Sequence, residues 1–350
     1  MKSEIYDPMG IVRVASRDQR PIQKMARLKG DAYIRYRRLW ERSNLGVMVH
    51  DFPLHLDIEI SSGCNLRCRS CIRSLPKKLK TFKDHNDESI SPDTFHKIIS
   101  EGIELGLCAI TLNGNNEPLL KNDISEYINT AASAGILDVM LHTNANLLKP
   151  EMANQLMGSG LTAIYFSIDA FSPETYSKVR PGGDYRRVIE NIHYFLGQKE
   201  KLGEELPITR VSFVETRFNT HELRSFVEYW EDKVDFVVSQ NFVTPYIDMP
   251  MYLETERAFR IPRKVLPSPK PCPYPFQRLL IRNNGDVTYC CSWYTYGIIL
   301  GNIYNQSIQE IWMGKSMQDL RNRVNGPEST WPDSCRKCRL AMVGESGATE

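Results

Sequence analysis

The sequence lacks the segments that would place the protein in a membrane or direct its export. No run of about 18 apolar residues occurs, so nothing is long enough to span a bilayer. The first ten residues, MKSEIYDPMG, contain no apolar signal core. A large charge of one sign is also missing, because the formal net charge is only +2. No strong field therefore attracts nucleic acid or anionic lipid, and we expect neither as a partner.

A disulfide framework is not expected either. The chain has nine cysteines, an odd number in a sequence without an export signal. Most of them fall into two groups that lie far apart in the sequence, which indicates metal ligation. The first group is Cys64, Cys68 and Cys71, and the second is Cys272, Cys290, Cys335 and Cys338. Metal-binding thiols imply a reducing compartment, so we expect a cytoplasmic location.

Apolar strand-like runs alternate with helix-like runs from residue 55 onward. The expected strands are His55–Ser61, Cys108–Gly114, Asp138–Asn144, Ala163–Asp169, Ile208–Glu215 and Asp235–Phe242. The expected helices are Pro92–Leu105, Ile124–Ala134, Pro150–Gly158, Tyr185–Leu202 and His221–Asp232. Six such repeats predict an α/β fold with a parallel sheet inside a layer of helices. Six strands are too few for a closed eight-stranded barrel, so we expect a partial, TIM-like barrel with its active face at the strand C-termini.

Composition changes divide the chain into further parts. Prolines crowd the stretch 245–271, which predicts a linker after a barrel over 51–244. Beyond it, Leu279–Arg282 and Val287–Cys291 flank a turn sequence and predict a hairpin, followed by a helix over about 307–324. We therefore expect a small hairpin-plus-helix iron–sulfur domain over 272–342 and a flexible tail over 343–350. Residues 1–50 are expected to form a helical extension.

The first cysteine group directly follows the first expected strand and therefore emerges at the active face. Three thiolates within eight residues suit a [4Fe–4S] cluster, and the missing fourth ligand leaves one iron open to a small molecule. The spacing CxxxCxxC after a first strand resembles the radical S-adenosylmethionine (SAM) superfamily. That resemblance implies that SAM binds the open iron and is reductively cleaved to methionine and a 5′-deoxyadenosyl radical. It also implies an electron donor such as flavodoxin or ferredoxin.

Other strand ends carry polar residues that the same resemblance assigns to SAM. The segment Gly114–Pro118 resembles the superfamily's GGEP-type segment and gives Glu117 as a contact for the SAM amino group. Asn144 follows the third strand, where the family presents ribose contacts. Ser167, in an S-I-D segment, and Arg180 are candidates for the SAM carboxylate, since a guanidinium matches a carboxylate in a bidentate manner. Singly, each of these residues is equally compatible with a turn or cap.

The second cysteine group resembles the SPASM/twitch subgroup of radical SAM enzymes. Cys272, Gly285, Cys290 and the C-terminal Cys335-x-x-Cys338 carry this resemblance. It implies an auxiliary [4Fe–4S] cluster ligated entirely by protein. A structural zinc site is the alternative, because four thiolates serve zinc equally well.

Cys291 is left without a ligand role and is the candidate catalytic residue. If Cys290 points to the auxiliary cluster, an adjacent strand residue faces the other way, toward the cavity. A thiol there could donate a hydrogen atom to a substrate radical. The alternatives are a core thiol, or ligation by Cys291 in place of Cys290.

Three enzymatic reactions and one non-catalytic function are compatible with these motifs. The first hypothesis is epimerisation of a polar, sugar- or aminocyclitol-like natural product. The second is two-electron dehydrogenation of an alcohol carbon, and the third is modification of a peptide (a RiPP precursor). A zinc-stabilised binding protein without radical chemistry is the fourth. Polar and aromatic linker residues could line a substrate cavity or an exposed loop, namely Tyr246, Asp248, Tyr252 and Glu254.

Overall fold

A computed structural model describes residues 13–15, 21–46, 48–74, 88–242, 272–291, 295 and 297–343. The linker expected over 245–271, with its four candidate cavity residues, lies outside the described residues. So does nearly all of the tail expected over 343–350, since only residue 343 is described.

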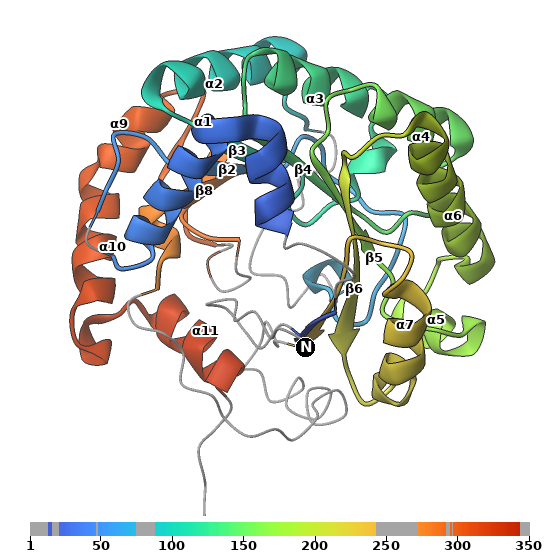
Figure 1. Cartoon of the computed structure of the whole chain (residues 1–350). Coiled ribbons are helices and arrows are strands. Elements are labelled where there is room, and N and C mark those ends of the chain that lie inside the picture. The colour runs from blue at the N-terminus through green and yellow to red at the C-terminus, as the bar shows by residue number, and fades with distance from the viewer. Residues whose placement is uncertain are drawn as a thin grey trace, which may run out of the picture.

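One continuous sheet forms the framework of the described protein, in the order β1-β7-β6-β5-β4-β3-β2-β8-β9-β10. Six consecutive strands pair in parallel, which confirms the expected partial barrel. They are β2 (His55–Ile58), β3 (Ala109–Thr111), β4 (Asp138–Thr143), β5 (Ala163–Ser167), β6 (Ile208–Glu215) and β7 (Phe236–Asn241). Figure 1 shows them curling around a central space, with helices on the outside.

The outer helices follow the strands in alternation. They are α2 (Pro92–Leu105), α3 (Ile124–Ser133), α4 (Pro150–Met157), α5 (Pro173–Val179), α6 (Tyr185–Leu202) and α7 (Leu223–Trp230). Local chemistry sets their ends: Ser91 caps α2 by accepting the Thr94 N–H at 3.1 Å, and Pro92 occupies its first turn. The bounds of α2, α6 and β6 coincide with those predicted.

Each barrel strand presents an apolar face to the helices and a more polar face to the interior. On β2, Leu56 and Ile58 belong to the main hydrophobic core, so His55 and Asp57 face inward. On β8, Leu279 and Ile281 are in the same core, which turns Arg278 inward. The barrel interior is therefore lined by polar side chains rather than filled by an apolar core.

Helix α1 (Pro21–Ser43) covers the mouth of the barrel where the strands begin. Its Met25, Tyr33 and Tyr36 pack against Leu54, Ala109, Ala163 and Ile208. Lys24 extends the contact through an ion pair with Asp235 at 2.8 Å. Strand β1 (Arg13–Ala15) adds an antiparallel edge to β7. The N-terminal segment thus closes the end of the barrel opposite the cysteine loop.

The predicted hairpin is present, but it continues the barrel sheet instead of forming a separate one. Strand β8 (Arg278–Ile281) pairs in parallel with β2, and β9 (Asp286–Thr288) returns antiparallel through a turn at Gly285. Strand β10 (Gly301–Asn302) pairs with β9. Residues 272–291 therefore supply both the edge of the barrel and the start of the second cysteine group.

The prediction of a single helix over 307–324 is wrong, because two helices occupy this range. Helix α9 (Ile308–Met313) ends before Gly314, where the backbone is extended, and α10 (Lys315–Asn325) follows. A side chain at Gly314 would approach the Glu310 carbonyl to 2.8 Å, so the sharp break requires glycine. Helix α11 (Asp333–Val343) then carries Cys335 and Cys338. Across the described segments, every helix is too short or too polar to cross a bilayer.

Candidate active site

The first three cysteines lie on the loop that leads from β2 into the short helix η1 (Ile72–Ser74). Two backbone bonds tie this loop to the α5–α6 connection: Arg67 N–H donates to Pro181 O at 2.9 Å and Arg69 N–H to Val179 O at 3.2 Å. Ser74 Oγ also donates to Cys68 O at 2.7 Å. The loop is therefore held at the C-terminal end of the barrel, as the sequence predicted.

The three thiols form a group around a shared space. Each is close enough to the others to affect their ionisation, and none of the nine cysteines is in a disulfide. Burial raises the pKa of all three thiols, that of Cys68 to about 12. Among the described residues, no three His, Cys, Asp or Glu side chains could hold a single metal ion. In a [4Fe–4S] cluster each thiolate binds a different iron. Three grouped thiols can therefore hold such a cluster even though they do not converge on a single metal ion.

Glu117 is buried beside this loop, and its carboxylate connects two strand ends. Thr143 Oγ1 donates to Glu117 Oε1 at 2.6 Å, and the Asn144 N–H donates to Oε2 at 2.8 Å. The Leu119 N–H adds a third bond at 3.2 Å. Burial raises the pKa of Glu117, and these donors only partly oppose that effect. Oε2 accepts only the Asn144 N–H among these bonds, so it keeps a lone pair for the predicted contact with the SAM amino group.

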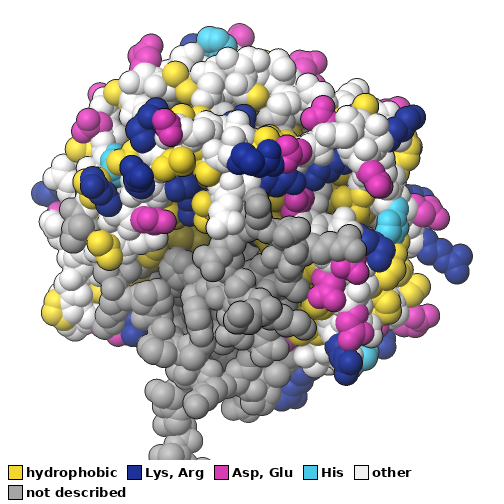
Figure 2. Space-filling view, in the orientation of Figure 1, with side chains coloured by type: hydrophobic (Ala, Val, Ile, Leu, Met, Phe, Trp, Pro, Cys, Tyr) yellow, Lys and Arg dark blue, Asp and Glu magenta, His cyan; other side chains and the backbone are white. Residues whose placement is uncertain are grey.

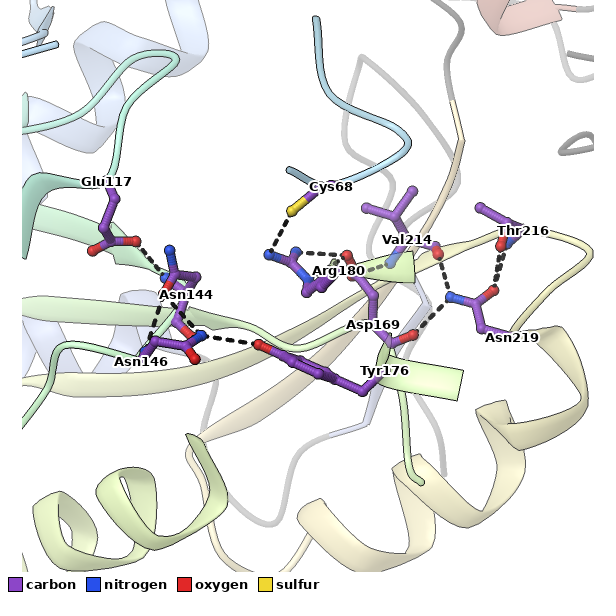
Figure 3. Close-up of polar contacts among 10 residues, drawn as sticks. All are labelled: Cys68, Glu117, Asn144, Asn146, Asp169, Tyr176, Arg180, Val214, Thr216 and Asn219. Atoms are coloured by element: carbon purple, nitrogen blue, oxygen red, sulfur yellow. Dashed lines mark hydrogen bonds and ion pairs between the residues drawn. The ribbon is translucent and has the colours of Figure 1, made fainter. Parts of the chain in front are cut away.

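Asn144 reaches the cysteine loop rather than pointing away from it. Its Nδ2 donates to Asn65 Oδ1 at 2.8 Å and lies 3.9 Å from Cys64 Sγ. Its Oδ1 accepts the Asn146 N–H at 3.0 Å, and Asn146 Nδ2 in turn donates to Tyr176 Oη at 3.0 Å (Figure 3). Sequence reasoning missed Asn65, Asn146 and Tyr176, because single polar residues in loops give no local signal.

Ser167 lies at the end of β5, level with Ser212 on β6. Ser212 Oγ is buried and has no hydrogen-bond partner in the described part of the chain. A polar group at this height of the barrel would satisfy it. These neighbouring hydroxyls therefore fit a polar ligand such as SAM at the strand ends.

Arg180 is buried and makes an ion pair with Asp169. Its Nε and Nη2 donate to Asp169 Oδ2 at 2.9 and 2.5 Å, and its Nη1 lies 3.7 Å from Cys68 Sγ (Figure 3). Burial alone would lower the pKa of Arg180, but Asp169 and Cys68 raise it above its ordinary value. The guanidinium is therefore a fixed positive charge next to the cysteine loop.

A third carboxylate supports the same region and was not predicted. Glu222 accepts the Ser172 hydroxyl at 2.5 Å, the Phe171 N–H at 2.6 Å and the Thr175 hydroxyl at 2.7 Å. These bonds fix the start of α5, the helix that leads to Arg180. In the sequence, Glu222 is only one acid in a charged helix start, so nothing singled it out.

The second group of cysteines gathers between η5 (Tyr274–Phe276), β9 and α11. Burial raises the pKa of Cys272, and with the contributions of Cys335 and Cys338 it reaches about 12. Cys290 is buried near Cys272 and Cys338. Tyr289 Oη lies 3.8 Å from Cys335 Sγ and completes the wall of the group. Four grouped thiols suit an iron–sulfur cluster ligated only by protein.

Cys290 and Cys291 have different surroundings, although both follow the end of β9. Cys290 packs into the hydrophobic core, whereas Cys291 is exposed. Their thiols are hydrogen-bonded, which raises the pKa of Cys290 and lowers that of Cys291. Because the two thiols are hydrogen-bonded to each other, the Cys291 side chain does not point directly away from Cys290, as the alternation of side chains along a strand had predicted. Cys291 nevertheless lies near the charges of Asp57 and Arg278 on the inner wall.

The inner wall near Cys291 carries a network of polar side chains. Arg278 Nη1 donates to Asp57 Oδ2 at 3.2 Å, and His55 Nε2 lies 2.8 Å from Thr111 Oγ1. Burial alone would raise the pKa of Asp57, but Arg278 and His55 lower it to about 2. Across the barrel, the Arg210 guanidinium stacks 3.8 Å from the centre of the Tyr165 ring. This wall offers donors, acceptors and aromatic faces to a polar ligand.

Comparison with known proteins identifies two domains in the chain. The model of the radical SAM superfamily matches residues 58–199, and that of an iron–sulfur cluster-binding domain, SPASM, matches residues 272–339. The chain is 30% identical to the probable GTP 3′,8-cyclase of Methanocaldococcus jannaschii over 177 residues, 51% of this chain and 55% of that protein. It is 32% identical to GTP 3′,8-cyclase of Alkaliphilus oremlandii over 181 residues, 51% of this chain and 53% of that protein. The chain thus aligns with about half the length of these relatives.

A solved structure supports the fold. Streptococcus suis SuiB bound to S-adenosylmethionine matches with a TM-score of 0.60 and 18% identity, covering 90% of this chain and 76% of that one. At that identity the likeness concerns the fold alone. The two matched domains together span more than half of the chain. The chain therefore contains a radical SAM domain over residues 58–199 and a SPASM iron–sulfur cluster-binding domain over residues 272–339, and these domains imply SAM and [4Fe–4S] clusters as its cofactors.

Proposed function

We propose that the chain is a radical SAM epimerase of a polar, sugar- or aminocyclitol-like natural product. Cys64, Cys68 and Cys71 hold the cluster that binds SAM, and Cys272, Cys290, Cys335 and Cys338 hold the second cluster. When bound, the SAM-binding cluster supplies an electron that cleaves SAM and yields a 5′-deoxyadenosyl radical. The observation that carries this proposal is the exposed residue Cys291, which is close enough to Asp57 and Arg278 of the barrel wall for their charges to affect its pKa.

The residues at the strand ends orient SAM in this proposal. Ser167 binds its carboxylate together with Arg180 Nη1, the one Arg180 nitrogen not bound to Asp169. Asn144 lies toward its ribose, and Glu117 shares an acceptor oxygen with its amino group. The buried Ser212 hydroxyl, which lacks a partner among described residues, supports a polar ligand at this height. An external flavodoxin- or ferredoxin-like protein provides electrons.

The barrel wall favours a small polar substrate. Asp57 accepts hydrogen bonds, while the Arg278 and Arg210 guanidiniums donate them. His142 stays neutral in the same wall, because burial and Arg210 lower its pKa to about 3. Hydroxyl and amino groups of a sugar-like molecule match this mixture of donors and acceptors. Helix α1 blocks the far mouth of the barrel, so the substrate enters from the cysteine side.

Cys291 performs the second half of the reaction. Removal of a hydrogen atom from one substrate C–H bond leaves a carbon radical. The Cys291 S–H bond then breaks, and its hydrogen atom forms the new C–H bond on the opposite face. One electron and one proton return the resulting sulfur radical to the thiol.

Product analysis of a cysteine variant tests this function. The reconstituted holoprotein is incubated anaerobically with SAM, a reductant and candidate glycosides in deuterated water, and products are read by mass spectrometry. The parent should yield an inverted product with one deuterium at carbon. Cys291→Ala should still consume SAM but lose inversion by about 100-fold.

Cys108→Ala is the matched control, because Cys108 is a half-buried thiol near the far end of the barrel. It should behave as the parent does. Unchanged inversion by Cys291→Ala would rule out the proposed role of Cys291 and, with it, this form of epimerisation.

Two other reactions are outcomes of the same experiment. A ketone without solvent deuterium would favour dehydrogenation of an alcohol carbon with the second cluster as electron acceptor. A modified peptide would favour the third hypothesis, and SuiB was itself crystallised with its precursor peptide SuiA. GTP belongs in the substrate panel, since the matched relatives are GTP 3′,8-cyclases.

A further inference from the structure

The ion pair between Asp169 and Arg180 is built more elaborately than a contact with SAM requires. Asp169 follows β5, and its backbone lies in the left-handed region at φ 59°, which residues other than glycine rarely adopt. Its carbonyl oxygen accepts Asn219 Nδ2 at 2.8 Å, and its Oδ1 accepts the Val214 N–H at 2.7 Å. Only Oδ2 remains, and it binds Arg180. The Asp169 backbone and its Oδ1 are thus fixed by bonds that do not involve Arg180.

Asn219 is itself fixed on both sides of its amide. Its Oδ1 accepts the Thr216 N–H at 2.7 Å and the Thr216 hydroxyl at 2.9 Å, while its Nδ2 also donates to Val214 O at 2.9 Å (Figure 3). Asn219 is completely buried. A series of hydrogen-bonded, buried side chains therefore connects the loop after β6 to the cysteine loop, through Thr216, Asn219, Asp169 and Arg180.

At the end of this hydrogen-bonded series, the Arg180 guanidinium lies against Cys68. With Nε and Nη2 bound to Asp169, the remaining Arg180 nitrogen, Nη1, lies 3.7 Å from Cys68 Sγ. Arg180 is close enough to act electrostatically on Cys64 and Cys71 as well. Within the described part of the chain, the carboxylates near Arg180 are Asp169 and Glu117, and a second cation, Arg73, acts on Cys64 and Cys71. Arg180 is thus a cation common to all three proposed ligands.

A fixed cation beside an iron–sulfur cluster changes how easily that cluster is reduced. The added electron increases the negative charge of the site, and a neighbouring positive charge or N–H···S bond stabilises that state. We propose that Arg180 is a positioning residue that raises the reduction potential of the SAM-binding cluster, and that Asn219 and Asp169 hold it against Cys68 for this purpose. This inference rests on the proposed ligation by Cys64, Cys68 and Cys71, but not on the substrate or on Cys291.

Potentiometric titration of the holoprotein without SAM or substrate tests the idea, with the reduced cluster followed by electron paramagnetic resonance. The relevant signal is the one that changes when SAM is added at the end. Arg180→Gln should make reduction about tenfold less favourable, a shift of about 59 mV to lower potential for one electron. Arg180→Lys keeps the charge and should recover more than half of that shift.

A neutral variant separates positioning from charge. Asn219→Ala changes no charge, yet it releases Asp169, so it should lower the potential in the same direction and by a smaller amount. Arg187→Gln is the matched control, because Arg187 is exposed and pairs with exposed Asp184. It should leave the potential unchanged.

Three results would overturn the proposal. One is an Arg180→Gln protein with full iron content and the parent potential. Another is an Arg180→Lys protein that shifts as far as Arg180→Gln, since the charge would then not be the cause. The third is an Asn219→Ala protein with the parent potential. Failure of the epimerase proposal would leave all three measurements unaffected.

Discussion

At the scale of single residues, the inner wall of the barrel shows how burial and charge decide what a side chain can do. His142 and Tyr165 face each other across β4 and β5 with ring centres 4.8 Å apart, and Arg210 lies against the same tyrosine. A protonated imidazole here would lie next to a guanidinium in a poorly solvated place. His142 is therefore a neutral hydrogen-bonding group at ordinary pH.

This neutrality makes the stability of the fold depend on pH. Burial and Arg210 lower the pKa of His142 from 6.5 to about 3. Between those values the unfolded chain binds a proton that the folded chain does not, so the free energy of unfolding decreases as the pH falls below about 6.5. His142→Gln should make the pH dependence between pH 5 and 6 shallower by about 1 kcal/mol per pH unit.

Urea unfolding of the anaerobic holoprotein, followed by tryptophan fluorescence, measures this slope. His96→Gln is the control, because His96 is exposed on α2 and should leave the slope as it is. A His142→Gln protein with the parent slope would mean that the imidazole is not held neutral in the barrel.

At the scale of elements, the connection between α5 and α6 positions the cysteine loop. Gly183 passes so close to Tyr176 that an added Cβ would lie 2.7 Å from a ring carbon and 3.1 Å from Leu66 Cδ2 of the cysteine loop. Tyr176 is buried and accepts a hydrogen bond from Asn146, so it has little room to move. Glycine at 183 lets the loop and the connection pack together.

Gly183→Ala should therefore cost about 1–3 kcal/mol of stability and loosen the cysteine loop. The expected signs are a lower urea midpoint and faster loss of iron to a chelator. Gly197→Ala is the control, since Gly197 lies inside α6 with nothing within 4 Å of its added Cβ. That change should stabilise the protein by up to about 1 kcal/mol. Equal iron loss from both variants would show that Gly183 does not position the loop.

The sequence predicted most elements, because their signals are local. Apolar strand runs and the Ser91 cap gave β6, α2 and α6 with correct bounds. The pairing of β8 with β2 joins residues more than 200 positions apart, so no local pattern announced it. The break at Gly314 depends on a close approach to the carbonyl of Glu310, four residues earlier, and the helical pattern of the sequence did not reveal it.

The candidate site divides in the same way. The spacing of Cys64, Cys68 and Cys71 is local, and it allowed the first thiol group to be predicted, whereas the second group, spread over residues 272–338, was predicted from its resemblance to the SPASM/twitch subgroup. The buried contacts around them depend on three-dimensional neighbours: Asn65 meets Asn144, Asp169 meets Asn219, and Glu222 meets Ser172. Each of these residues follows a strand or begins a helix, where polar residues are common for other reasons.

At the scale of the whole molecule, one sheet joins the two thiol groups. Because β8 extends the barrel beside β2, the segment after β9 brings Cys291 near Asp57. Figure 2 shows charged side chains of both signs scattered over the viewed face, without a large patch of one sign. Recognition of the substrate is thus expected inside the barrel and not on this surface.

The proposed function requires that Cys64, Cys68 and Cys71 hold a [4Fe–4S] cluster whose fourth iron binds SAM. The most direct test is electron–nuclear double resonance on the reduced holoprotein with SAM that carries ¹⁵N in its amino group. A Cys335→Ala, Cys338→Ala double variant, which lacks the second cluster, removes the overlapping signal. We expect a SAM-dependent change in the cluster spectrum and a direct coupling to ¹⁵N in both proteins. A cluster spectrum that SAM leaves unchanged, with no ¹⁵N coupling, would contradict it.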